Sequence, residues 1–118
     1  MDKLDLIFDK QRALDDDIAS RRHLHFTREE WIQKGVLAMV AELSEVLDET
    51  RFKWWKNQAP VDDTALKNEL VDVLHFFISM CIRSGMRADE LCDLYMEKNR
   101  ENFDRQHGRS DKPGYEVE

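Results

Sequence analysis

The sequence predicts an all-α protein, a four-helix antiparallel bundle that is completed by dimerisation. Only four Gly and two Pro occur, against 42% hydrophobic and 36% charged residues, which is a balance typical of compact helical proteins. Apolar residues recur at helical spacing in four segments joined by short links. With 118 residues the chain has room for one modest core, so we expect a single domain over residues 1–118.

The first two helices are predicted from periodicity and capping. Apolar residues between Leu4 and Ile18 follow one helical stripe, with Gln11 and Asp15 close to it. The segment "SRRHLHFTREEW" then indicates a connection. Within it, Thr27 and Glu30 have the spacing of a capping box, so a second helix should begin here and run toward Arg51.

The second half of the chain predicts two more helices and a tail. The loop "KNQAPVDD" offers Asp62 or Asp63 as the N-cap of a helix that ends at Gly85. This third helix is apolar on almost every side, which favours burial on several faces, including contact with a second subunit. A fourth helix should run from residue 87 or 88 to about residue 105, followed by a flexible tail over about 106–118. The alternative architecture is a helical hairpin that completes its core only as a dimer.

The net charge, the two cysteines and the distribution of apolar residues argue against some classes of partner and location. A net charge of −7 and a pI near 5.1 argue against binding to nucleic-acid polymers, which depends on Lys and Arg. Cys81 and Cys92 lie in apolar surroundings without metal-type spacing, which predicts buried, reduced thiols. Neither a signal peptide nor a membrane-spanning run is recognisable, so we expect a cytoplasmic protein without a membrane partner.

Carboxylates at helical spacing are the strongest chemical signal. Glu42, Glu45 and Glu49 should project from nearly one face of the second helix, and Glu69 and Asp72 form the same i, i+3 pair on the third. One such pair alone usually belongs to a solvated face. Two pairs on adjacent apolar helices repel one another and are costly to bury unless a cation holds them together. Hard oxygen ligands favour Mg²⁺, with Mn²⁺ as the alternative.

The same residues carry a family resemblance. "ELSE" (residues 42–45) followed by "ELVD" (residues 69–72) resembles the signature of the all-α NTP pyrophosphatases, which include the dimeric dUTPases, the MazG-like enzymes and the dCTP pyrophosphatases. The chain is most similar to the dimeric dUTPase branch in "FDKQRALDDDI", "RFKWWK", "ELVDVLHF" and "YMEKNRENFDRQHG", with Tyr115 beyond them.

The resemblance implies Mg²⁺-dependent hydrolysis of dUTP to dUMP and pyrophosphate. Glu42, Glu45, Glu69 and Asp72 would hold the metal, and Glu42 would orient or deprotonate the attacking water. Glu49 either joins the ligands or faces Lys53. One alternative keeps this chemistry but acts on dCTP or modified nucleotides, as a MazG-like or dCTP-type enzyme does. Another is a non-catalytic helical dimerisation module with an acidic face.

Base and sugar recognition is assigned to three further positions. Gln11 offers a donor and an acceptor that suit the edge of uracil, although an exposed helix residue is the plainer interpretation. Trp54 or Trp55 would stack on the base, with Trp54 preferred by its spacing; core packing is the alternative. His75, one turn from Asp72, would approach the deoxyribose or a phosphate unless it is a core residue.

Phosphate recognition is assigned to the last predicted helix and the tail. Lys98, Asn102 and Arg105 would grip the triphosphate, although by themselves they fit a solvated face. Tyr115 would close over the phosphates.

Two features depart from the resemblance. Asp15 stands near the base where we expect a neutral amide. Longer members have additional helices that complete the pocket, so we expect a neighbouring subunit of a homodimer or homotetramer to contribute.

Overall fold

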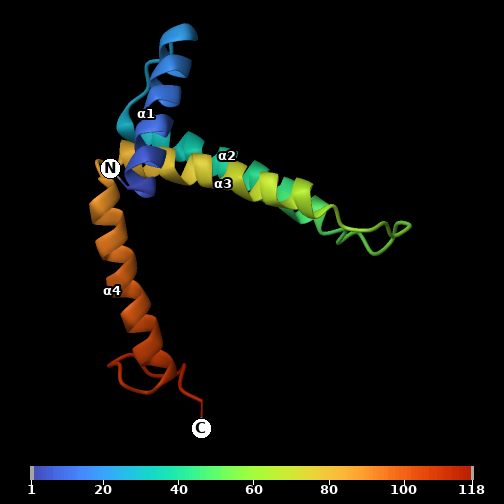
Figure 1. Cartoon of the computed structure of the whole chain (residues 1–118), viewed down its shortest axis with the longest axis vertical. Helices are drawn as coiled ribbons and strands as arrows, with labels where there is room; N and C mark the ends of the chain where they lie inside the picture. Colours follow the sequence, from blue (N-terminus) through green and yellow to red (C-terminus); the bar gives the residue numbers. More distant parts are fainter. Residues whose placement is uncertain (1, 118) are drawn as a thin grey trace. The chain divides into compact units, whose positions relative to one another are not determined.

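The computed structural model describes residues 2–117, and this part of the chain contains four α-helices and no strand. Figure 1 shows α1 (Lys3–Arg21), α2 (Arg28–Glu49), α3 (Asp63–Arg83) and α4 (Ala88–Gln106). The predicted all-α class and the four helices are therefore confirmed. Their closure into one antiparallel bundle and its completion by a second subunit stay predictions.

The helices begin and end where local side chains satisfy their free backbone groups. Thr27 and Glu30 form the expected capping box at the start of α2. Asp62, not Asp63, caps α3 by accepting from two backbone N–H groups. Gly85 follows the end of α3 with φ of 86°, a left-handed conformation that suits glycine. The first helix is longer than predicted, because the pattern of apolar residues ends before the backbone hydrogen bonding does.

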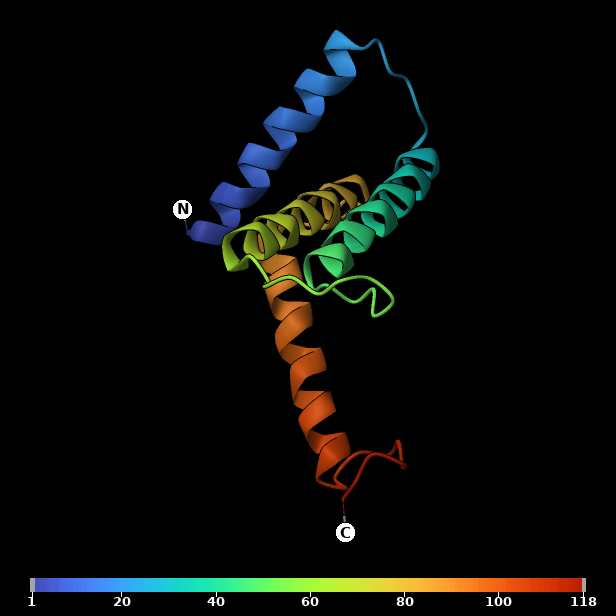
Figure 2. The same ribbon diagram turned by 90° about the vertical axis from the view of Figure 1, so that its right-hand side faces the viewer.

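The first compact unit ends at Gly85 and contains α1, α2 and α3. α2 and α3 lie side by side and antiparallel, joined by the loop over residues 50–62, and α1 packs on α3 (Figures 1 and 2). Gly35 permits the close approach of α2 to α3, since a Cβ at this position would lie 2.6 Å from Met80 Cγ. The most buried side chains are Phe8 on α1 and Ile78 on α3.

The second unit contains α4 and the tail that follows it. The tail folds back on the end of α4, where the Arg109 guanidinium lies 3.2 Å from Asp104 and the Ser110 hydroxyl donates to Glu101. Flexibility of the tail stays a prediction, and its last residue, 118, lies outside the described part.

Several expectations about burial change with the structure. Both cysteines are free; Cys81 is buried, but Cys92 is exposed, so the prediction of a buried thiol is wrong there. On α3, Leu70 and Val71 stay half exposed within the chain, because α1 and α2 do not surround the helix. No helix within residues 2–117 is long and apolar enough to span a bilayer.

Candidate active site

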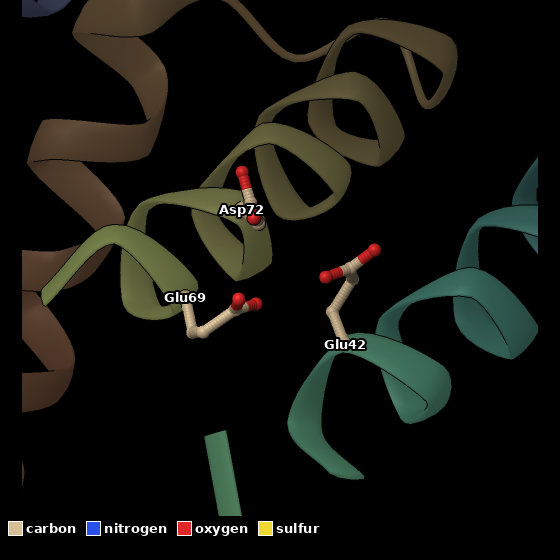
Figure 3. A group of neighbouring side chains, drawn as sticks. All are labelled: Glu42, Glu69 and Asp72. Carbon is tan, nitrogen blue, oxygen red and sulfur yellow. The ribbon is translucent and has the colours of Figure 1, made fainter. Parts of the chain in front are cut away.

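Three predicted carboxylates converge between α2 and α3. Glu42 extends from α2 toward Glu69 and Asp72 on α3 (Figure 3). One oxygen of each can be chosen so that all three lie within 4.8 Å of one another. The antiparallel pairing of the two helices therefore brings residues almost thirty positions apart into one acidic cluster.

The cluster has the chemistry of a divalent-cation site. The Oε2 atoms of Glu42 and Glu69 are buried and have no hydrogen-bond partner among the described residues. Buried polar atoms are normally paired, and a buried carboxylate is strongly disfavoured without a counter-charge. Oxygen ligands of this kind suit Mg²⁺ or Mn²⁺ better than zinc. The residues thus fit the metal that the sequence predicts.

The electrostatics of the cluster show the same need for positive charge. A hydrogen bond with Glu45, partial burial and the charges of neighbouring carboxylates raise the pKa of Glu69 to about 6. Burial, followed by the charge of Glu45 and a hydrogen bond with it, also raises the pKa of Glu42. Each of the two carboxyl groups therefore holds a proton more readily than an isolated glutamate, as expected where like charges meet.

The other two predicted ligands lie at the margin of the cluster. Glu45 is exposed, and it contributes to the raised pKa values of Glu69 and Glu42, so it lies beside the cluster. Glu49 lies one turn further along α2 and is not among the three residues whose oxygens converge. Its role as a ligand stays a prediction.

A cavity of about 560 Å³ borders the cluster within the first unit. Its volume is in the range typical of small-molecule sites. All three helices of the unit contribute to its lining, including Gln11 and Asp15 from α1, Trp31 and Glu42 from α2, and Asp72 and Ser79 from α3. Glu42 and Asp72 therefore face both the cavity and the acidic cluster.

Gln11 lies in this cavity and is buried, with 7% of its surface exposed. The interpretation of Gln11 as an exposed helix residue is therefore wrong. Its Nε2 donates to Asp15 Oδ1 at 2.9 Å, and Ser79 Oγ on α3 donates to Asp15 Oδ2 at 2.8 Å. Sequence reasoning missed Ser79 because the contact joins residues 64 positions apart.

His75 also lines the cavity, although it is exposed and not a core residue. Its Nδ1 lies 3.0 Å from the carbonyl oxygen of Val71. A carbonyl oxygen can only accept, so this contact places a proton on Nδ1 and leaves Nε2 of the neutral ring as an acceptor.

The tryptophan that lines the cavity is Trp31, which the sequence did not single out. The Arg83 guanidinium lies 4.2 Å from the centre of its ring, and Phe26 packs edge-on against it. Trp54 is 80% exposed in the loop after α2 and packs edge-on against Trp55. Neither of these two contributes to the cavity lining, so their stacking on a base stays a prediction.

The predicted phosphate ligands lie in the second unit. Lys98 and Asn102 are exposed on α4. Arg105 pairs with Glu101 at 3.3 Å, and its guanidinium lies 5.3 Å from the Tyr115 ring centre. Tyr115 thus lies against Arg105, another predicted phosphate ligand, and the contact of both with phosphate stays a prediction.

Comparison with known proteins identifies the family. A family model described as dUTPase matches residues 3–90, which include the acidic cluster and the whole cavity. The chain belongs to this dUTPase family. The predicted resemblance, and with it membership of an enzyme family, is confirmed.

Two curated relatives of this dUTPase-family chain carry a different substrate in their names. A dCTP pyrophosphatase of Enterobacteria phage T4 is 46% identical over 48 residues, which cover 41% of this chain and 28% of the relative. A dCTP pyrophosphatase of Enterobacteria phage LZ5 is 43% identical over 58 residues, which cover 49% and 34%. The matches thus span about a third of these relatives or less. No solved structure matches the chain.

Proposed function

We propose that the chain is a metal-dependent pyrophosphohydrolase of a pyrimidine deoxynucleoside triphosphate, acting on dCTP to yield dCMP and pyrophosphate. The observation that carries the proposal is the position of Glu42 and Asp72, which belong at once to the acidic cluster and to the cavity lining. A nucleotide whose base enters the cavity would bring its phosphates to the cluster. The dUTPase-family match and the relatives named dCTP pyrophosphatase support this reaction class.

The acidic residues would hold the metal. Glu42, Glu69 and Asp72 offer converging oxygens, and Glu45, which influences the pKa of Glu69, would join them. A bound Mg²⁺ would supply positive charge to the phosphate oxygens and lower the pKa of water. Glu42 is the carboxylate we assign to the attacking water, because it faces both the cluster and the cavity. Water would hydrolyse the bond between the α and β phosphates, so that dCMP and pyrophosphate are released.

The second candidate substrate is dUTP. It is favoured by the family description and by the similarity of the chain to dimeric dUTPases. The names of the curated relatives favour dCTP instead, and so does the polar chemistry of the cavity.

The oligomer is proposed on the basis of exposed apolar surface. Leu37 and Val40 on α2 are 70% and 58% exposed, and Leu70 and Val71 on α3 are half exposed. Apolar faces of this extent on a soluble helical unit usually mark protein interfaces. We infer that a second copy of the chain covers them in a homodimer, or two dimers in a homotetramer.

A substrate panel tests the proposal. Purified protein is incubated with dCTP, dUTP and dTTP in MgCl₂ or EDTA, and pyrophosphate release is measured. We expect Mg²⁺-dependent release that is fastest with dCTP; equal turnover of dCTP and dUTP would remove the base assignment. Glu69→Gln should abolish release while the protein stays folded. A non-catalytic dimerisation module would release no pyrophosphate from any of the three.

A further inference from the structure

A hydrogen-bonded chain of three side chains crosses from α1 to α3 along the cavity. Asp15 accepts from Gln11 through Oδ1 and from Ser79 through Oδ2. Both partners donate, so an ionised carboxylate satisfies them without rearrangement. Because Oδ1 of Asp15 can only accept, the NH₂ end of the Gln11 amide must face Asp15.

The polar groups that remain for a ligand are mostly acceptors. A carboxylate offers about four lone-pair sites, and Gln11 and Ser79 occupy two of those on Asp15. Gln11 retains Oε1 and one N–H. Asp15 and Gln11 together therefore present three acceptor oxygens and a single amide donor.

Cytosine and uracil differ in the groups that would meet these atoms. Cytosine has an exocyclic amine, which donates, beside a ring nitrogen that accepts. Uracil has a carbonyl oxygen beside a ring N–H. A carbonyl oxygen facing Asp15 would leave two acceptors opposed and unpaired, whereas an exocyclic amine would donate to them. Sites built to hydrogen-bond one such group reject the analogue that lacks it.

We propose that Asp15 is the specificity-determining residue of this cavity and selects a pyrimidine with an exocyclic amine over one with a carbonyl. The proposal rests on the proposed function and adds the atom that reads the base. Ser79 acts as a positioning residue, because it holds Asp15 from α3 without itself being required to touch the base.

The other charged residues of the cavity are engaged elsewhere. Glu42 and Asp72 belong to the acidic cluster. Arg83 lies over Trp31, and Lys34 lies 4.5 Å from the centre of the Phe26 ring. Asp15 is thus the carboxylate of the cavity lining that remains outside the metal cluster.

The test compares two nucleotides that differ only along this edge of the base, in the exocyclic group and the ring nitrogen beside it. Binding of dCMP and dUMP is measured by calorimetry with wild type and Asp15→Asn, which keeps the size of the side chain but exchanges an acceptor for a donor. We expect wild type to prefer dCMP and Asp15→Asn to lower that preference by about 10- to 100-fold, the usual effect of losing a hydrogen bond to a charged group. Ser79→Ala should shift the ratio in the same direction by less. Asp16→Asn, an equal change of charge at an exposed position outside the cavity, should leave it unchanged.

An unchanged dCMP to dUMP ratio in Asp15→Asn overturns the assignment. If Asp15→Asn does not fold by circular dichroism, an unchanged ratio in Ser79→Ala overturns it instead. Turnover separates the two proposals. Hydrolysis of dCTP with a ratio insensitive to residue 15 refutes the role of Asp15 alone. A dCMP preference that depends on Asp15, without hydrolysis of any triphosphate, refutes the enzymatic proposal alone.

Discussion

The acidic cluster predicts that the metal-free protein loses stability as the pH rises from about 4.5 to about 6. The pKa of Glu69 is raised from 4.5 to about 6 in the folded chain. The folded state therefore binds more protons than the unfolded state within this window, and protonation stabilises it. The contribution is fully present below about pH 4.5 and is lost as the pH rises through about 6. By pH 7.5, above this raised pKa, most Glu69 carboxyl groups have lost the proton.

Magnesium should replace the missing proton at neutral pH. A ligand that binds only the folded state stabilises it by about 2.7 kcal/mol at 100 times its Kd. For a domain of this size that corresponds to a rise in Tm of roughly 10 °C. The magnesium-induced shift should be smaller at pH 5, where protons occupy the same oxygens.

Thermal melts followed by circular dichroism test both effects. Wild type is measured at pH 5 and pH 7.5, each with EDTA or MgCl₂. Glu69→Gln mimics the protonated carboxyl group, so its metal-free Tm at pH 7.5 should exceed that of wild type, and its magnesium shift should disappear. Glu97→Gln, an equal change on exposed α4 surface, should behave as wild type. A magnesium shift that survives in Glu69→Gln would refute the assignment of the cluster.

Three further outcomes are expected. Trp31→Leu should weaken dCMP binding by about 2- to 10-fold through loss of an aromatic surface in the cavity, measured by calorimetry; full affinity would place the base elsewhere, and Trp54→Leu would then test stacking by the exposed loop. Gly85→Ala should lower the free energy of unfolding by about 1 kcal/mol in urea titrations, because φ is 86° and an added Cβ would have no atom within 4 Å to pack against. An unchanged free energy of unfolding would contradict this reason. Leu37→Asp should halve the mass seen by light scattering if α2 forms the dimer interface, and an unchanged oligomer would exclude this face.

The helices and the acidic cluster could be predicted from the sequence because both depend on short-range spacing. The capping box that marks the start of α2 is a motif of only four residues, from Thr27 to Glu30. The i, i+3 spacing of Glu69 and Asp72 likewise places both on one face of α3. The convergence of Glu42 with them required only that adjacent helices pair antiparallel.

Gln11 and His75 were predicted to lie in the site, but the rest of the α1 and α3 lining could not be predicted, because it depends on how α1 crosses α3. Ser79 and Asp15 meet across 64 residues, and no local pattern marks that contact. Trp31 lies in the first turn of α2, where sequence alone does not distinguish a cavity residue from a surface one. The burial of Gln11 likewise follows from tertiary packing and not from its place in the stripe of α1.

The most direct test of the central claim is to follow dCTP by ³¹P NMR with wild type and with Glu42→Gln, each in MgCl₂ and in EDTA. We predict that dCMP and pyrophosphate form only with wild type in MgCl₂. Products of dCDP and phosphate, or equal turnover by Glu42→Gln or in EDTA, would contradict a metal-dependent pyrophosphohydrolase centred on this acidic cluster.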